Sequence, residues 1–195
     1  MPGNAIRLVV GLGNPGKRYE GTRHNVGFLA VDRFVADAGG KWGASPVGKG
    51  LAVDLRRPEG PVWVLKPHTF MNASGEMVAE FSRYYKIPSP VILVVSDDFQ
   101  LPLGRIRLRA RGSAGGQKGL DSVLALLGTQ EVPRMRLGIG PLPERWDPVD
   151  FVLGGFGPPE REELERMIEK AAAALGAVLD GGLEPAMNAY NGGAE

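Results

Sequence analysis

The most hydrophobic short run in the chain is VILVVS, residues 91–96, and two aspartates, Asp97 and Asp98, follow it directly. A continuous apolar run of this length is typical of a strand that helices cover on both faces. A second apolar, β-branched run, IRLVVGL at residues 6–12, closes in glycine. We therefore expect a sheet with the 91–96 strand at its centre and helical layers on both faces.

The remaining periodicities alternate between helix and strand. Apolar residues at helical spacing predict helices over residues 25–38, 72–86, 120–127 and 159–180. Short apolar or alternating runs predict further strands over residues 50–56, 62–66, 105–110, 135–139 and 150–153. This order indicates an α/β fold: a single-domain, three-layer α/β/α architecture with a mixed, mainly parallel twisted sheet. We expect one domain over residues 1–195, with a short helix and a frayed end in the tail 181–195.

Four polar or glycine-rich segments connect the predicted elements, at residues 13–24, 66–72, 97–98 and 111–118. In open α/β sheets, ligands bind outside the carboxyl ends of the strands. We therefore expect these four segments to converge on one face and to form the functional site.

The composition excludes several kinds of site. The chain has no cysteine and only two histidines, His24 and His68, so thiol nucleophiles are excluded and a multi-histidine zinc site is disfavoured. No apolar run reaches the roughly 18 residues of a membrane span. The opening MPGNAIRLVV lacks the layout of a secretory signal. The absence of cysteine fits a reducing cytoplasm, and these observations favour neither a metal site, a cofactor site nor a membrane partner.

One motif suggests a dinucleotide. Residues 11–16, GLGNPG, match G-x-G-x-x-G directly after a predicted strand. That fingerprint needs a helix that begins at the glycines, so that its amide groups face the pyrophosphate. Here Pro15 lies inside the turn, and the next helical pattern begins only near Asn25. A nicotinamide cofactor is therefore disfavoured.

His24 is the candidate general base, because a neutral imidazole with a pKa near 6.5 can take a proton from water. A carboxylate on the other ring nitrogen would fix its tautomer, and Asp97 is the best candidate for that role. Packing or helix capping is the alternative for His24, and Mg²⁺ binding is the alternative for Asp97 and Asp98. The chain lacks a phosphate-binding loop, and Ser113 lies outside a G-x-S-x-G elbow, so water is the favoured nucleophile.

Two side-chain amides, Asn14 and Asn72, fall in the converging segments. An amide offers a donor and an acceptor, which suits gripping a peptide group or orienting a water. Turn formation is the alternative for Asn14, and capping of the 72–86 helix, by Asn72 or Ser74, is the alternative for Asn72. Phe70 and Met71 precede Asn72, either as core residues or as a platform for a base or an apolar side chain.

The net charge of +1 conceals a gradient. Residues 99–145 carry eight basic and three acidic side chains, whereas residues 146–195 carry three basic and ten acidic ones. Arg105, Arg107, Arg109 and Arg111 alternate along one predicted strand and therefore share a face. With Lys118, Arg134 and Arg136 they form either a phosphate-binding surface or a solvated one.

Four blocks of sequence carry a resemblance: LVVGLGNPGKRYEGTRHNVGF, KPHTFMNASGEMV, VSDDFQLPLGRIRLRARGSAGGQKGL and PRMRLGIG. In this order and at this spacing they closely resemble the bacterial peptidyl-tRNA hydrolase family over residues 6–155. The resemblance implies a monomeric, metal-free esterase of the cytosol that cleaves the ester between a peptide and the 3′-terminal ribose of its tRNA.

The resemblance also implies roles for single residues. His24 would be the catalytic base, and Asp97 would hold it. Asn72 would position the water and the substrate, and Asn14 would help distinguish N-blocked peptidyl esters from free aminoacyl-tRNA.

Further matches concern the tRNA. Tyr19 and Phe70 match positions assigned to the tRNA end, and Arg109 and Arg136 match basic positions associated with tRNA phosphates.

The sequence departs from the family pattern at one loop. This loop commonly reads GGHNGL in the family, and here it reads GGQKGL, residues 115–120. Lys118 stands where the family usually has a substrate-binding asparagine. A charged lysine cannot accept a hydrogen bond, although it can contact a phosphate. The alternative function is a non-catalytic RNA-binding member of the same fold, because relatives in plant chloroplasts serve in intron splicing.

Overall fold

The computed structural model describes residues 5–58 and 60–192. Within these residues the strands form one seven-stranded sheet in the order β2-β3-β4-β1-β5-β7-β6. The strands are Leu8–Gly11 (β1), Gly43–Ala44 (β2), Gly50–Arg57 (β3), Gly60–Pro67 (β4), Ile92–Pro102 (β5), Ile106–Arg109 (β6) and Arg134–Gly140 (β7).

The centre of the sheet is parallel and its edges are antiparallel. Strands β4, β1, β5 and β7 run parallel to one another, whereas β2 pairs with β3, β3 with β4 and β6 with β7 in antiparallel fashion. All four residues of β1 are buried, as are the first six of β5. The expectation of a mixed, mainly parallel sheet with the 91–96 strand near its centre is confirmed.

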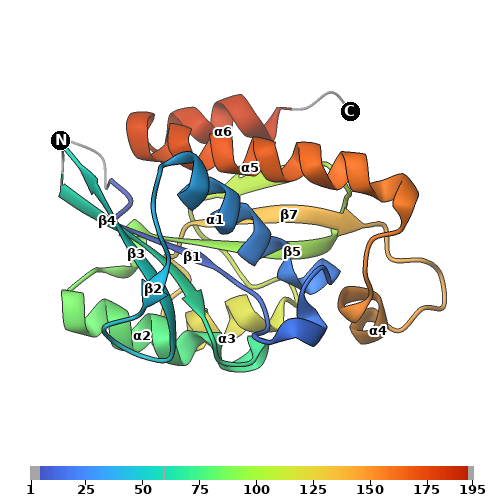
Figure 1. Cartoon of the computed structure of the whole chain (residues 1–195), viewed down its shortest axis with the longest axis horizontal. Coiled ribbons are helices and arrows are strands. Elements are labelled where there is room, and N and C mark those ends of the chain that lie inside the picture. The colour runs from blue at the N-terminus through green and yellow to red at the C-terminus, as the bar shows by residue number, and fades with distance from the viewer. Residues whose placement is uncertain (1–4, 59, 193–195) are drawn as a thin grey trace.

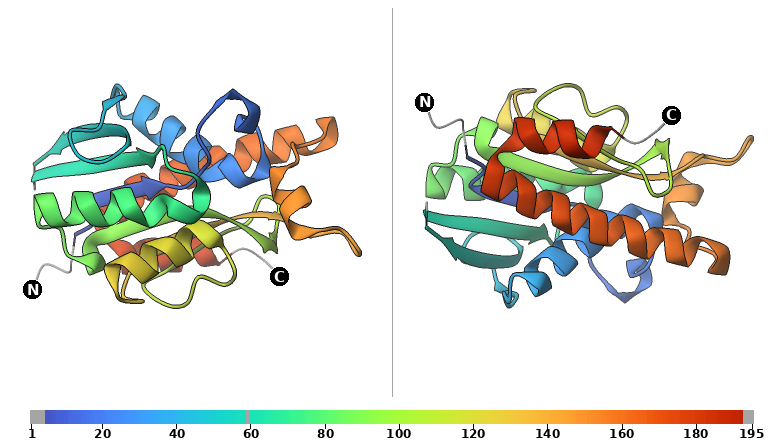
Figure 2. Two further views of the ribbon diagram at one scale, coloured as in Figure 1. Left: turned by 90° about the horizontal axis from the view of Figure 1, so that it is seen from below. Right: turned by 90° about the horizontal axis from the view of Figure 1, so that it is seen from above.

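Helices cover both faces of this sheet (Figure 1). The α-helices are Val26–Asp37 (α1), Ser74–Tyr85 (α2), Lys118–Leu127 (α3), Pro148–Leu153 (α4), Arg161–Gly181 (α5) and Leu183–Asn191 (α6). Short 3-10 helices are Lys17–Tyr19 (η1), Arg23–Asn25 (η2), Met71–Ala73 (η3), Ser89–Val91 (η4) and Pro158–Glu160 (η5). Figure 2 shows α2 and α3 side by side on one face and α5 and α6 on the other. The three-layer architecture is therefore confirmed.

A close approach between α1 and the sheet positions the residues just before this helix. A Cβ atom on Gly27 would lie 2.5 Å from the Leu12 carbonyl oxygen and 2.6 Å from that of Val95. Only glycine lets the first turn of α1 lie this close to the end of β1 and to Val95 inside β5. This contact brings His24, in η2, beside the carboxyl half of β5.

Three local predictions need correction. Residues 150–153 do not form a strand, since they belong to α4, where Asp147 accepts hydrogen bonds from the amides of Val149 and Asp150. The residue before α2 is Ala73, and the first-turn amide of Gly75 donates to the Ser122 hydroxyl at 3.0 Å, so neither Asn72 nor Ser74 acts as the cap of this helix. Strand β5 continues to Pro102, so Asp97 lies inside this strand, beyond Val95, the last residue that pairs with β1.

The C-terminal helix completes the edge of the sheet. Helix α6 packs on β6, and the side chain of Asn191 accepts from the Leu108 amide at 2.7 Å and donates to the Leu108 carbonyl at 2.9 Å. The short helix predicted in the tail is therefore confirmed, and the predicted frayed end falls on residues 193–195, outside the described residues. Among the described helices, none is both long and apolar enough to cross a membrane.

Candidate active site

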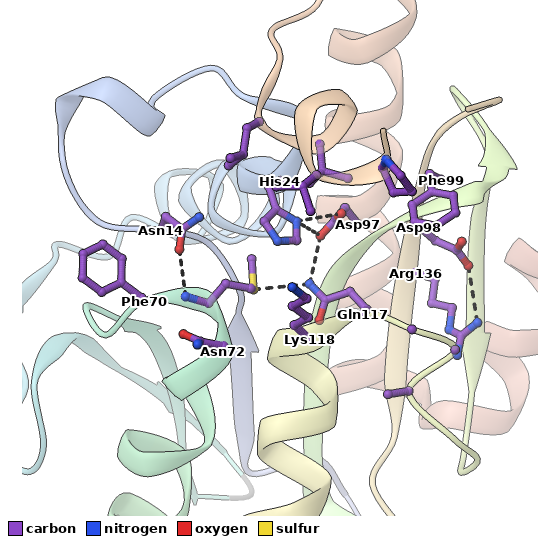
Figure 3. Close-up of a pocket in the computed structure, with 18 residues that line it drawn as sticks. Asn14, His24, Phe70, Asn72, Asp97, Asp98, Phe99, Gln117, Lys118 and Arg136 are labelled. Carbon is purple, nitrogen blue, oxygen red and sulfur yellow. Dashed lines mark hydrogen bonds and ion pairs between the residues drawn. The ribbon is translucent and has the colours of Figure 1, made fainter. Parts of the chain in front are cut away.

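A pocket opens where the segments after β1 and β4 meet β5 and the start of α3 (Figure 3). All four predicted segments contribute to its lining, so their predicted convergence is confirmed. The polar and charged lining residues are Asn14, His24, Asn72, Asp97, Asp98, Gln117, Lys118 and Arg136. The remaining lining residues are Phe70, Met71, Phe99, Ala114, Gly115, Gly116, Pro148, Val149, Val152 and Leu153.

The sequence prediction that His24 pairs with Asp97 describes the geometry correctly. The Nδ1 atom of His24 lies 2.9 Å from each of the two Asp97 carboxylate oxygens. The Asp97 side chain is 3% exposed and that of His24 is 12% exposed. Because an ionised carboxylate only accepts hydrogen bonds, Asp97 favours the tautomer of His24 that carries its proton on Nδ1. The unprotonated Nε2 can then accept a proton.

Gln117 is a pocket residue that sequence reasoning missed. Its Nε2 donates to Asp97 Oδ1 at 3.0 Å and to Met71 Sδ at 3.3 Å, while its Oε1 accepts from the Leu120 amide at 2.6 Å. Gly115 and Gly116 precede it with φ of +61° and +86°, which L side chains rarely adopt. The tight turn at these glycines brings Gln117 from the start of α3 to the histidine–aspartate pair.

Asn14 is held in one orientation by its neighbours. Its Oδ1 accepts from the Met71 amide at 2.7 Å, so its Nδ2 is left to donate. The backbone of Asn14 exchanges two hydrogen bonds with the Asn25 side chain, at 2.8 and 3.0 Å. Asn25 follows His24 in η2, so these hydrogen bonds hold the loop of Asn14 against the helical turn of His24.

Asn72 and Phe70 are exposed residues of the pocket lining, and Tyr19 contacts Phe70. Asn72 is exposed and lines the pocket together with Phe70, which is 59% exposed. The ring of Tyr19 meets the Phe70 ring edge-on at a centroid distance of 6.5 Å. Tyr19 itself is outside the pocket lining, whereas Met71 is buried and lines the pocket floor.

The predicted basic residues divide into two groups. Arg136 lines the pocket, where it pairs with Asp98 at 3.4 Å and donates to the Ser113 carbonyl at 3.0 Å. Lys118 also lines the pocket and is exposed at the first position of α3. Arg109 is outside the lining, exposed on β6 directly opposite Arg134 of β7.

Arg134 is buried and shapes the glycine-rich loop. Its guanidinium donates to the carbonyl oxygens of Val132, Ser113 and Gly112, each at 2.8 Å. Burial, and secondarily the charge of Arg136, lowers the pKa of Arg134 to about 10. The sequence left two alternatives for Arg134, a phosphate-binding surface or a solvated one, and its burial at 1% exposure contradicts both.

An ion pair between Arg23 and Glu160 lies next to His24. Arg23 donates to both carboxylate oxygens of Glu160, at 2.9 and 2.8 Å, and its guanidinium lies 4.6 Å from the ring centroids of Phe151 and Phe156. Hydrogen bonding from Arg23 holds the pKa of the Glu160 carboxyl below its ordinary value. This contact fixes η2 against the segment that follows β7.

The wall formed by α4 was also missed. Pro148, Val149, Val152 and Leu153 line the pocket because residues 148–153 are helical. No cluster of three or more metal-ligating side chains occurs within residues 5–58 and 60–192.

Comparison with known proteins identifies the family of the chain. A family model described as "Peptidyl-tRNA hydrolase" matches residues 8–195. The chain belongs to the peptidyl-tRNA hydrolase family. It is 44% identical over 188 residues to the peptidyl-tRNA hydrolase of Elusimicrobium minutum, covering 95% of this chain and 99% of that protein. It is also 44% identical over 181 residues to the peptidyl-tRNA hydrolase of Mycobacterium marinum, covering 93% and 95% of the two chains.

A solved structure supports the same assignment. The crystal structure of peptidyl-tRNA hydrolase from Acinetobacter baumannii superposes with a TM-score of 0.89 at 33% identity, over 96% of this chain and 95% of that one. The resemblance inferred from the four sequence blocks is therefore confirmed.

Proposed function

We propose that this protein hydrolyses the ester bond of peptidyl-tRNA, or of N-blocked aminoacyl-tRNA, and releases the peptide and free tRNA. The observation that carries the proposal is the hydrogen bond between His24 and Asp97 within a pocket that Asn14 and Asn72 also line, in a member of the peptidyl-tRNA hydrolase family. A water activated by His24 is the nucleophile.

The reaction begins with proton transfer from water to His24. With Nδ1–H directed at Asp97, the unprotonated Nε2 takes the proton as the water oxygen attacks the ester carbonyl carbon. The adjacent carboxylate stabilises the imidazolium that forms. When the tetrahedral intermediate breaks down, the carbon–oxygen bond to the ribose breaks and the imidazolium returns the proton to the leaving 3′ oxygen. The protein regains its starting state.

The two asparagines supply polar contacts to the substrate. Asn14 has its oxygen occupied by the Met71 amide, so its Nδ2 is the end that donates to a carbonyl of the peptide. In an N-blocked substrate, the α-nitrogen of the esterified residue carries an acyl group whose carbonyl can accept this hydrogen bond. A free aminoacyl ester has an amino group there and no such carbonyl. Asn72 orients the water and donates toward the negative charge that develops on the ester oxygen.

The tRNA contacts extend from the pocket along the sheet. Phe70 and Met71 form one side of the pocket, and Tyr19 supports Phe70, so these residues receive the terminal nucleotide. Lys118 and Arg136 also line the pocket and contact phosphates near the 3′ end.

Arg109, exposed on β6, extends the phosphate contacts away from the pocket. Binding through such contacts weakens as the salt concentration rises.

We also propose that the protein acts as a monomer in the cytoplasm, as one domain over residues 1–195 and without a metal. These proposals rest on the family resemblance. Cleavage is expected to continue in the presence of EDTA, and sedimentation velocity is expected to give one species of about 20.8 kDa. A larger species, or loss of activity restored by a divalent cation, would contradict them.

A discharge assay tests the proposed function. N-acetylated aminoacyl-tRNA and the same unblocked aminoacyl-tRNA are incubated side by side with the purified protein. We expect rapid release of the acetylated amino acid and little release of the unblocked one. Absence of ester cleavage at saturating blocked substrate, together with retained tRNA binding, would favour a non-catalytic RNA-binding protein of the same fold.

A further inference from the structure

We propose that Gln117 is a positioning residue that fixes the Asp97 carboxylate against His24. The inference deepens the proposed function and rests on it for its kinetic consequences. Gln117 stands in the loop where this chain departs from the pattern GGHNGL, so its contacts were not expected from the resemblance.

The first observation is that every polar atom of the Gln117 side chain is already engaged. Its Nε2 has two hydrogens, and these point at Asp97 Oδ1 at 3.0 Å and at Met71 Sδ at 3.3 Å. Its Oε1 accepts from the amide of Leu120 at 2.6 Å. A side chain with both donors used has none left for substrate, although it lines the pocket. This is why Gln117 acts through Asp97 and is not a substrate-binding group.

The second observation fixes the orientation of the amide. The Leu120 N–H can only donate, so the oxygen of Gln117 must face it. The nitrogen must then face Asp97, whose ionised carboxylate can only accept. The start of α3 therefore determines which end of Gln117 meets the carboxylate.

The third observation concerns what Asp97 needs. Among the described residues, the side-chain hydrogen bonds to its carboxylate come from His24 and Gln117. Both carboxylate oxygens lie 2.9 Å from Nδ1 of His24, so a single N–H is shared between them and neither oxygen is fully satisfied by the imidazole. A second donor gives Oδ1 a hydrogen bond of its own, and it helps to satisfy an ion that is 3% exposed.

Two variants separate positioning from capping of α3. Gln117→Glu retains an oxygen that accepts from Leu120 at the helix N-terminus, but it places a carboxylate against Asp97 in place of the donor. Gln117→Met fills similar space, removes the donor to Asp97 and also removes the cap. We expect both variants to melt at a lower temperature than the wild type, Gln117→Glu because its carboxylate repels that of Asp97 and Gln117→Met because the cap of α3 is lost.

The kinetic test uses N-acetylated aminoacyl-tRNA at pH 8. We expect kcat to fall about tenfold or more in both variants, with KM within about twofold of wild type, because the loss concerns a coupled network and not a substrate contact. A raised KM with unchanged kcat would instead make Gln117 a substrate-binding residue and overturn the proposal.

A spectroscopic test does not depend on activity. The chain has two histidines, so ¹⁵N-labelled His24 and His68 are readily resolved, and His24→Ala assigns them. We expect Gln117→Glu to raise the pKa of His24, because added negative charge favours the imidazolium, while His68 is unchanged. Other charged groups lining the pocket are Asp98, Lys118 and Arg136, and these are the same in both proteins.

The outcomes are distinguishable. If Gln117→Glu retains wild-type kcat and an unshifted His24 titration, Gln117 only caps α3 and the proposal is wrong. If the wild-type protein does not cleave the ester, the proposed function fails, while the titration still decides whether Gln117 controls the pair.

Discussion

The guanidinium of Arg23 donates hydrogen bonds to both carboxylate oxygens of Glu160, a residue 137 positions further along the chain. The guanidinium also lies over two aromatic rings, those of Phe151 and Phe156. His24 is the next residue after Arg23, so the candidate base is anchored by an ion pair that reaches across the sequence. Disturbing this pair should affect both stability and the placement of His24.

Replacing Glu160 by glutamine tests this anchor. Hydrogen bonding from Arg23 depresses the Glu160 pKa in the folded protein, so the ion pair stabilises the fold above the unfolded-state pKa of about 4.3 and loses its effect as the pH falls through the lower folded value. We expect Glu160→Gln to lower the free energy of unfolding by about 1–2 kcal/mol at pH 7. The deficit should shrink below about pH 4.

Urea unfolding at several pH values measures this deficit. Glu169→Gln is the control, since Glu169 belongs to an exposed pair with Arg33 and should change stability little. An equal, pH-independent loss in both variants would contradict the prediction.

Replacing Asp97 by asparagine tests the role assigned to the carboxylate. A neutral amide cannot stabilise the imidazolium, and in either orientation its NH₂ group would face the Nδ1–H of His24. We expect kcat to fall by about 10²- to 10⁴-fold. Affinity for tRNA should stay unchanged, because Asp97 is buried. Single-turnover cleavage and filter binding measure the two quantities, and a large loss of affinity would show that Asp97 acts in another way.

Replacing Asn14 by aspartate tests substrate discrimination. An aspartate oxygen can still accept from the Met71 amide, so the loop is expected to keep its conformation. The other oxygen replaces a donor with a negatively charged acceptor, which should reduce kcat/KM for blocked substrate by about tenfold or more. Cleavage of unblocked aminoacyl-tRNA should change much less. If kcat/KM falls equally for both substrates, Asn14 does not contact the blocking group.

Replacing Arg109 by alanine tests the tRNA path along β6. We expect KM to rise more than kcat falls, and the slope of log affinity against log salt to decrease by about 0.7–0.9, as for one lost phosphate contact. Arg33→Ala is a matched control, because Arg33 lies on α1 and pairs with Asp37 and Glu169. Identical salt slopes for wild type and Arg109→Ala would exclude Arg109 from the tRNA contacts.

Replacing Lys118 by asparagine tests the departure from the family pattern. Because the exposed ammonium group lines the pocket, we expect the substitution to raise KM by about threefold to tenfold and to reduce the salt dependence of binding. The turnover number should change little, since the prediction assigns Lys118 to phosphate contact. Lys41→Asn, at an exposed lysine before β2, is the control. A fall in kcat without a change in KM would place Lys118 at the reacting ester instead.

The layered sheet and the meeting of the four segments could be predicted, because continuous apolar runs and polar strand ends are local signals. The pairing of His24 with Asp97 followed from chemistry, since a base near a strand end needs a carboxylate partner. The strand predicted over residues 150–153 is a helix because the three apolar residues of this segment fit a strand or a buried helix equally well. Asp147 followed by Pro148 is a helix-start signal that could have corrected this.

The network around the pair could not be predicted. Gln117 contacts Asp97 from β5, Met71 from η3 and Leu120 from its own helix, and only the tertiary fold brings these groups together. The same holds for Arg23 and Glu160, because many charged residues in the chain are equally plausible partners. Burial of Arg134 was hidden for a related reason: alternating arginines look alike in sequence, whichever of them the neighbouring loop covers.

The contact between Asn191 and Leu108 has a consequence for how the protein behaves at high concentration. Strand β6 ends the sheet, and an uncovered N–H and C=O at its rim would offer a template on which a strand of another molecule could pair. The amide of Asn191 occupies both groups of Leu108 and takes the place of such a strand. The last turn of α6 therefore removes one position at the sheet edge where a strand of another molecule could pair.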